Sequence, residues 1–419
     1  MRDTDLYEQL LGLRAPWHVE DVSFDREQGW VTVRVEASPD AEWSCPECGQ
    51  PAPGYDHRVR RWRHLDTMQY YTVLEANVPR VRCTEHGVRQ VAVPWAEPGS
   101  GYTALFEALV IDWLNETSVQ AVARQLSLSR GAVDRIMQRA VERGLARRAA
   151  VQPVNLSVDE TSFQKRHEYV TVVTDADRGQ VLYVADERTR ESLSRFYGGL
   201  EEDQLTGIRS VSMDLWPAYI HATEAAVPDA RKKIAFDKFH VAQYLGNAVD
   251  NVRRQEHKAL RREGDERLKR SRYHWLRNPE NMTRAQKEHF AALRDSSLKT
   301  ARAWAMKEFA MDLWHYRSRT WAEKGWKRWI GWAQRCRLEP MKKVGQTVQK
   351  NLWGILNAVV LNASNGPAES MNARIQRVKR QACGFRNRDR FRNAIYFHCG
   401  GLDLYPETLK LQGYPHRSV

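Results

Sequence analysis

Two short segments place an acidic residue at the end of an alternating pattern of apolar and small polar side chains. In VNLSVD, which ends at Asp159, Val, Leu and Val alternate with Asn, Ser and Asp. The segment SVSMD, which ends at Asp214, repeats this phase with Ser, Ser and Asp. A period of two is typical of a β-strand, so each acid is predicted on the polar face where a strand ends.

These two carboxylates predict a divalent-cation site. If the two strands are neighbours, Asp159 and Asp214 come together at one end of a sheet, where like charges resist joint ionisation. A divalent cation removes that cost, and Mg²⁺ is commonly held by one or two carboxylates together with phosphates. For either acid alone, the commoner interpretation is a turn residue at the end of a strand.

A third acid, Glu369, lies in the segment GPAESMNARIQRVKRQ. Pro367 suits the first turn of a helix, where a carboxylate also gains from the helix dipole. Asn372 follows on roughly the same face. Residues 374–392 carry eight Arg or Lys against one acid, so this region is predicted to contact DNA through Lys379, Arg380, Arg386 and Arg388. The alternative is a solvated amphipathic helix with a capping glutamate.

Two knuckles before residue 100 have the spacing of zinc ligands. CPECG and CTEHG each hold two candidate ligands separated by two residues and followed by Gly. The predicted ligands of one tetrahedral, structural Zn²⁺ are Cys45, Cys48, Cys83 and His86. The alternative is two unrelated turns with buried thiols; His57 and His64 compete as ligands but fit the spacing less well.

Residues 117–144 predict a helix-turn-helix. Two helical apolar stripes flank Ser127-Leu128-Ser129, and Ser129 can cap the second helix. The residues predicted to stay outside and contact DNA are Arg130, Arg135, Arg139 and Arg143. The alternative is an ordinary helical hairpin whose arginines are solvated.

The composition agrees with a polyanionic partner. The chain has 419 residues and a net charge of +13, which favours double-stranded DNA. A run of about 18 apolar residues is lacking, so no membrane span is expected. The N-terminal MRDTDLYEQL has acids where a secretory signal is basic, which predicts a cytoplasmic protein with reduced thiols.

The pattern of elements changes along the chain. Residues 1–100 are predicted β-rich, 102–148 helical, and 240–365 almost wholly helical and rich in Trp and basic residues. Between them, strands alternate with helices. The predicted strands are 154–158, 168–174, 180–185, 208–213 and 232–236.

Taken in order, these features resemble one known family. VDET, MDLWPAY, FDKFH, ESMNARIQ and CGFRN, after the zinc knuckles and helix-turn-helix, are similar to blocks of the ISL-three type of bacterial insertion-sequence transposases. The resemblance implies a DDE catalytic triad of Asp159, Asp214 and Glu369, with Asp237, His240 and Asn372 as auxiliary residues. One departure is His86, where a fourth zinc cysteine is frequent in the family.

The resemblance also implies a multidomain α/β and α fold. An RNase H-like mixed-sheet core, interrupted by an all-helical insertion, would follow a zinc-ribbon-like domain and a helix-turn-helix. The expected domains are a zinc-binding β-rich DNA-binding domain (1–100), the helix-turn-helix domain (101–149), the first part of the core (150–239), the helical insertion (240–365) and the C-terminal part of the core with the basic helix (366–419).

The activity implied is cleavage of DNA at terminal inverted repeats and joining of 3′-OH ends to target DNA, by a homodimer that brings two ends together. Two Mg²⁺ ions, with Mn²⁺ as an alternative, would bridge the scissile phosphate. A non-catalytic zinc and helix-turn-helix regulator stays open as an alternative, as does a metal nuclease without strand joining.

Overall fold

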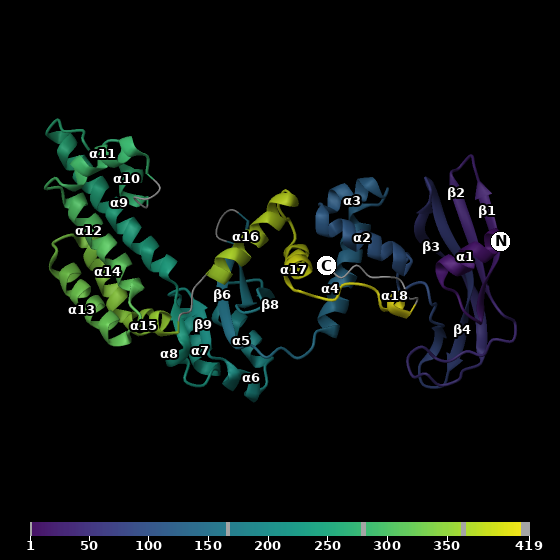
Figure 1. Cartoon of the computed structure of the whole chain (residues 1–419). Helices are drawn as coiled ribbons and strands as arrows, with labels where there is room; N and C mark the ends of the chain where they lie inside the picture. The colour runs from purple at the N-terminus through teal and green to yellow at the C-terminus, as the bar shows by residue number, and fades with distance from the viewer. Residues whose placement is uncertain (1, 165–167, 278–281, 362–365, 412–419) are drawn as a thin grey trace. The chain divides into compact units, whose positions relative to one another are not determined.

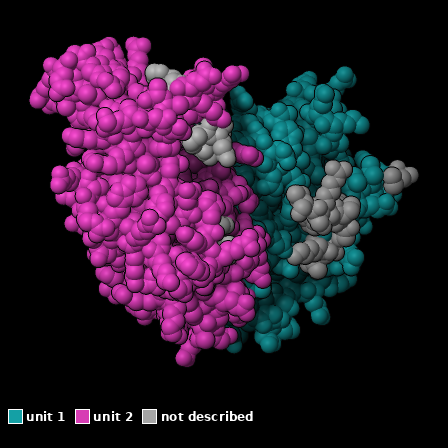
Figure 2. Space-filling view, turned by 60° about the vertical axis from the view of Figure 1, so that its left-hand side comes forward, with its two compact units in different colours: residues 1–149, 381–383, 396–419 teal, residues 150–380, 384–395 magenta. Residues whose placement is uncertain are grey.

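The computed structural model describes residues 2–164, 168–277, 282–361 and 366–411 (Figure 1). The described chain forms two compact units, coloured separately in Figure 2. Unit 1 comprises the described parts of residues 1–149, 381–383 and 396–419, and unit 2 those of 150–380 and 384–395. No helix among the described residues is both long and apolar enough to cross a membrane.

Unit 1 begins with α1 (Asp3–Leu11) and a twisted sheet of long strands. The sheet has the order β1-β2-β4-β3, with β5 paired to β4, and β2 and β4 run parallel. Gly29 has a φ of 72° in the turn between β1 and β2, a backbone conformation that favours glycine. The strand bounds are Trp17–Asp25, Trp30–Ala37, Gly54–Thr67, Tyr70–Cys83 and Gly87–Gln90.

Three helices complete the first part of unit 1. They are α2 (Ala104–Glu116), α3 (Val119–Gln125) and α4 (Arg130–Arg147). Ser129 accepts a hydrogen bond from the Ala132 backbone N–H, so the predicted cap of α4 is confirmed. The turn between α3 and α4 places Ser127 at a φ of 53°. The helix-turn-helix is therefore present at the predicted position.

The C-terminal segment of the chain returns to unit 1 and not to unit 2. The α17 helix (Arg388–Cys399) ends there, and α18 (Glu407–Leu411) follows. Arg147 and Arg148 of α4 donate to the carbonyl oxygens of Tyr405 (2.7 Å) and Gly400 (2.9 Å). The structure thus differs from the expected domain 366–419, because the arginines of α4 hold residues beyond 396 in unit 1.

Unit 2 is built on a second five-stranded sheet with the order β10-β9-β6-β7-β8. The antiparallel hairpins β6-β7 and β7-β8 occupy one side, while β9 and β10 run parallel to β6 on the other. Each observed strand lies close to its predicted range. The bounds are Asn155–Gln164, Glu168–Asp175, Gln180–Ala185, Ser210–Met213 and Ile234–Phe236.

Short helices connect these strands. The α5 (Arg190–Gly198) and α6 (Glu202–Gly207) helices lie between β8 and β9 in the chain, and α7 (Pro217–Ala226) and α8 (Ala230–Lys233) lie between β9 and β10. The apolar face of the strands, with Leu156 and Val158, contributes to the core that these helices share. The opposite residues of β6 are therefore left for the polar side of the sheet.

A helical block separates β10 from α16 (Gly366–Gln381), as predicted (Figure 1). Trp326 and Trp329 are fully buried in it, and Trp329 Nε1 donates to the Met306 carbonyl at 2.8 Å. Trp321 is 60% exposed. The block consists of α9 (Lys238–Arg262), α10 (Arg272–Leu276), α11 (Arg284–Arg294), α12 (Lys299–Asp312), η2 (Leu313–His315), α13 (Arg319–Arg335), α14 (Glu339–Lys350) and α15 (Leu352–Val360).

Candidate active site and metal centres

Three parallel strands place three aspartates side by side at one edge of the unit 2 sheet. Asp159, Asp214 and Asp237 each follow a residue of one row of register partners, namely Val158, Met213 and Phe236. The Asp237 backbone N–H donates to the Met213 carbonyl at 3.1 Å, which extends this row. Neighbouring strands lie about 4.8 Å apart, so the predicted closeness of the first two acids follows from the register.

The prediction that the first strand ends at Asp159 is wrong. The β6 strand continues to Gln164, because ETSFQ keeps the alternation and pairs with β7. Asp159 therefore lies inside β6. The neighbouring strand β9 ends at Met213, the register partner of Val158, so β6 has no strand beside it on the β9 side from Asp159 onward. The carboxylate is held there from both sides, by the Glu160 backbone N–H (2.7 Å) and by Asn372 Nδ2 (2.5 Å).

The electrostatics of Asp159 are those of a buried carboxylate among like charges. Burial, together with the charges of Asp214 and Asp237, raises its pKa to about 6, although the Glu160 backbone N–H and His240 act in the opposite direction. A divalent cation bound here would offset the repulsion between these carboxylates.

Asp214 is paired with an arginine that the sequence analysis did not select. Arg188 Nη2 donates to Asp214 Oδ2 at 2.8 Å, and its guanidinium also pairs with Glu160 and lies 4.2 Å from the centroid of the Trp216 ring. Among the described residues, the other oxygen of Asp214, Oδ1, is buried without a hydrogen-bond partner. Burial raises the pKa of Glu160 to about 7 even beside this arginine.

His240 lies between the two later aspartates. Its Nε2 is 3.8 Å from Asp214 Oδ1 and 3.7 Å from Asp237 Oδ2. Asp237 caps α9 by accepting the Phe239 backbone N–H at 2.8 Å, and burial raises the pKa of Asp237. Two of the three predicted auxiliary residues, Asp237 and His240, thus lie at the sheet edge formed by Asp159, Asp214 and Asp237, which we call the acid edge.

The α16 helix lies along β6. Asn372, Gln376 and Lys379 reach Asp159, Thr161 and Ser162 in turn, at 2.5, 2.8 and 2.6 Å. Glu369, one turn before Asn372, is exposed, lines a pocket with Asp237 and raises the pKa of Asp237 by its charge. The third predicted acid therefore lies on the side of Asp237, one helical turn from the contact with Asp159.

The carboxylates of the acid edge are spaced more widely than the ligands of a preformed metal site. Within the described ranges, no three of its side chains bring ligand atoms within 4.8 Å of one another. Asp214 Oδ1, which accepts no hydrogen bond from the described residues, and the raised pKa values nevertheless fit a cation-binding role.

Two of the four basic residues within 374–392 that were predicted to contact DNA form hydrogen bonds inside unit 2. Lys379 donates to the Ser162 carbonyl, and Arg388 donates to the Asp186 carbonyl (3.1 Å) and Glu168 (3.3 Å). Arg380 and Arg386 are exposed. These last two remain the stronger candidates for contact with DNA.

The helix-turn-helix arginines divide in the same way. Arg130 and Arg135 are exposed. The prediction that Arg143 stays outside is wrong, because its side chain is 7% exposed and pairs with Glu97 and the buried Glu107. Arg139 is partly buried and pairs with the same Glu107. Helical periodicity alone could not reveal these partners.

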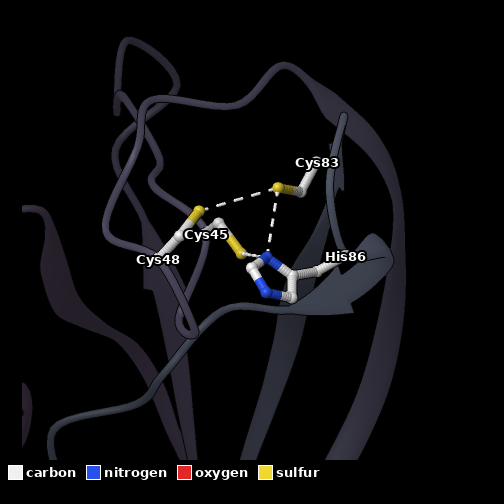
Figure 3. A group of neighbouring side chains, drawn as sticks. All are labelled: Cys45, Cys48, Cys83 and His86. Atoms are coloured by element: carbon white, nitrogen blue, oxygen red, sulfur yellow. Dashed lines mark hydrogen bonds between the residues drawn. The ribbon is translucent and has the colours of Figure 1, made fainter.

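Cys45, Cys48, Cys83 and His86 meet in a single cluster in unit 1 (Figure 3). Their ligand atoms all lie within 4.8 Å of one another, and Cys45 Sγ and Cys83 Sγ are 3.8 and 3.6 Å from His86 Nδ1. Cys48 Sγ is 3.7 Å from Cys83 Sγ. A tetrahedral ion with Zn–S bonds of about 2.3 Å requires ligands about 3.8 Å apart, so the residues fit Zn²⁺.

The surroundings of the cluster favour the thiolate of Cys83 and orient the histidine. Backbone N–H groups of His86 and Glu85 lower the pKa of the Cys83 thiol to about 6. His86 Nε2 lies 3.6 Å from Glu47, as in carboxylate–histidine–zinc arrangements. His64 is buried elsewhere, against Thr103 at 2.9 Å, so it is not a competing ligand.

Comparison with known proteins gives three family matches in chain order. Residues 41–86 match a zinc-finger of transposase IS204/IS1001/IS1096/IS1165, and residues 91–141 match the helix-turn-helix domain of transposase family ISL3. Residues 156–395, more than half of the chain, match a model described as a transposase of the same ISL3 group. The zinc-finger match and the Cys3His cluster together support a structural zinc.

Curated relatives cover nearly the whole chain. The transposase for insertion sequence element IS1557 of Mycobacterium tuberculosis is 29% identical over 420 residues, which is 92% of this chain and 93% of the relative. The transposase for insertion sequence element IS1001 of Bordetella parapertussis is 28% identical over 398 residues, 93% and 97% of the two chains.

Proposed function

The chain belongs to the ISL3 family of insertion-sequence transposases, and from this premise we propose that unit 2 holds an RNase H-like DDE active site. In this proposal the protein binds the terminal inverted repeats of its element, cleaves DNA phosphodiesters and joins 3′-OH ends to target DNA. The observation that carries it is the row of aspartates at the edge of a mixed sheet, with Glu369 on the adjoining helix. The strand order, two hairpins beside two parallel strands, supports the RNase H-like assignment.

Asp159, Asp214 and Glu369 would hold two divalent cations, Mg²⁺ or Mn²⁺. When bound, such ions activate an attacking water or 3′-hydroxyl and stabilise the leaving oxygen of a phosphodiester. The fit rests on the buried Asp214 Oδ1, which has no hydrogen-bond partner in the described part of the chain, and on the raised pKa of Asp159. A cation would favour the ionised form of each carboxylate.

The remaining residues of the site position the acids. Asn372 donates a hydrogen bond to one oxygen of Asp159, and Arg188 donates to one oxygen of Asp214. The other oxygen of Asp214 accepts no hydrogen bond from the described residues and is therefore available to a cation. His240, within 4 Å of two aspartates, can donate a proton to one of them or to a phosphate oxygen. These contacts hold the groups in place before the DNA binds, which lowers the cost of reaching the reactive geometry.

DNA binding would be shared between the units. The zinc domain and helix-turn-helix of unit 1 would bind the repeats, with Arg130 and Arg135 as candidate contacts, and Arg380 and Arg386 would bind near the acid edge. We expect a homodimer on DNA, because two element ends must be joined in one reaction.

Cleavage of a duplex that carries the ends of the encoding element tests this function. We expect Mg²⁺-dependent nicking by the wild type and loss of nicking in Asp159→Asn. The matched control is Asp177→Asn, since Asp177 is an exposed turn residue bonded to Asn155. Strand-joined products would exclude a simple nuclease, whereas binding without any cleavage would favour the non-catalytic regulator and overturn the proposal.

A further inference from the structure

We propose that a pocket beside the acid edge binds one unstacked nucleobase of the DNA substrate. The pocket has a volume of about 610 Å³ and lies among the start of α9, the end of α12 with η2, the end of α15 and the start of α16. Asp237 and Glu369 line it, so one wall belongs to the proposed active site. The inference rests on the proposed function, since it names a contact that the same DNA would make.

Three large aromatic side chains, Phe239, Trp314 and Tyr316, line the other walls together with smaller apolar residues. Phe239 is 59% exposed and Tyr316 is 41% exposed, although large apolar rings gain most from burial. Trp314 also lines the pocket and packs against the core, where its ring meets the buried Trp326 edge-on at 5.7 Å between centroids. Exposed rings supported by a rigid base form a surface on which a planar base can stack.

The charges around the pocket suit a nucleotide. Lys238 and Arg317 are exposed and line it, so they can neutralise the phosphates on either side of an inserted base. Asp237 and Glu369 would repel those phosphates alone, but cations bound at the acid edge would offset this repulsion. A small apolar ligand would not need the two basic residues.

The size and place of the pocket favour a single base over a duplex. Ligand pockets of about 300–1,000 Å³ hold small molecules, so a stacked double helix cannot enter and a base must leave the stack. Phe239 is 6.2 Å from His240 between ring centroids, and His240 contacts Asp214 and Asp237. The base is therefore expected within a few nucleotides of the cleaved bond.

A binding cycle between one side chain and one base tests the inference. The full-length, zinc-loaded protein is titrated in Ca²⁺ with duplexes of the element end, each carrying an abasic nucleotide at one position near the cut. Phe239→Ala and Tyr316→Ala should each weaken binding of intact DNA about tenfold. When the missing base is the one that occupies the pocket, wild type and variant should bind the abasic duplex equally well, because neither can then stack on that base. Trp321→Ala is the control, because Trp321 is equally exposed in the same helical block but does not line the pocket.

The outcomes separate this inference from the proposed function. Wild-type protein that cleaves the ends but shows no coupling at any position overturns the base pocket alone. Failure of the wild type to bind or cleave the ends overturns the proposed function as well. Tyr316→Ala keeps the test valid should Phe239→Ala lose its fold, because Tyr316 follows η2 while Phe239 lies in the first turn of α9.

Discussion

Asn372 Nδ2 donates a 2.5 Å hydrogen bond to Asp159 Oδ2 across 213 positions of sequence. This contact joins α16 to β6 at the acid edge. Both carboxylate oxygens of Asp159 then accept a hydrogen bond, Oδ1 from the Glu160 backbone N–H and Oδ2 from Asn372. Since Glu369 precedes Asn372 by one helical turn, the same contact also sets the position of the third acid.

We expect Asn372→Ala to lower cleavage and Mn²⁺ affinity about 10- to 100-fold, because a group that orients a metal ligand typically contributes this much. Gln376→Ala is the control, since Gln376 reaches Thr161 from the same helix without touching an acid. Calorimetric titration with Mn²⁺ and a nicking assay would measure both effects. Equal losses in the two variants would show that the helix contact as a whole, and not the bond to Asp159, matters.

Arg188 is expected to stabilise the fold by neutralising Glu160 and Asp214. Arg188→Gln leaves two partly or fully buried carboxylates without this cation, which costs about 3 kcal/mol of unfolding free energy. Mg²⁺ should restore part of the loss, because it supplies the missing positive charge. Urea unfolding with and without Mg²⁺ tests this, with the exposed Arg190→Gln as control. A loss that Mg²⁺ does not reduce would contradict an electrostatic role.

The sequence revealed the acids but not Arg188, for a physical reason. Successive residues of a strand point to opposite faces, so Asp159 and Asp214 could be identified from alternating patterns of five or six residues. Arg188 lies between β8 and α5, outside any periodic element, and gains its partners only when β6 and β9 pair. Arg143 was misplaced for a related reason, since its face of α4 is covered by chain from beyond residue 396.

The affinity for divalent cations should rise with pH. Burial and the neighbouring acids raise the pKa of Asp159 to about 6, so in the folded chain this proposed ligand keeps a proton that a cation must displace. We expect Mn²⁺ affinity to increase up to about tenfold per pH unit for each proton released, and to level off above about pH 8. Calorimetric titrations with Mn²⁺ in buffers of different ionisation enthalpy would measure how many protons are released on binding.

The raised pKa values of Asp159 and Glu160 determine whether the stability of the folded chain rises or falls with pH. Between about pH 4 and pH 7 the folded metal-free chain binds more protons than the unfolded chain, so its stability from these groups falls as pH rises. The difference between wild type and Glu160→Gln in urea unfolding isolates one group from the rest of the protein. A difference that does not change across this range would contradict the raised pKa of Glu160.

Loss of one zinc ligand should empty the cluster of unit 1. Cys83→Ser removes the thiol whose pKa is lowered to about 6, and we expect its zinc content to fall from about one ion per chain toward none. His86→Cys should retain zinc, since four thiolates also suit a tetrahedral ion. Metal analysis and thermal unfolding measure this, with the exposed Cys383→Ser as control. Full zinc content in Cys83→Ser would contradict the ligand assignment.

Gly354 should be required where α15 crosses β10. A methyl group there would overlap ring carbons of Phe236, which is fully buried directly before Asp237. Gly354→Ala is therefore expected to cost about 1–3 kcal/mol through overpacking, although alanine favours a helix by about 1 kcal/mol. Gly331→Ala is the control, because only the flexible Arg335 guanidinium lies near it, and it should leave stability unchanged or raised.

Since Phe236 sets the position of Asp237, Gly354→Ala should lower cleavage more than its lost stability explains at a temperature where the protein stays folded. Urea unfolding and nicking assays on both alanine variants separate the two effects. Normal cleavage in a destabilised Gly354→Ala protein would show that the acid edge tolerates displacement of β10.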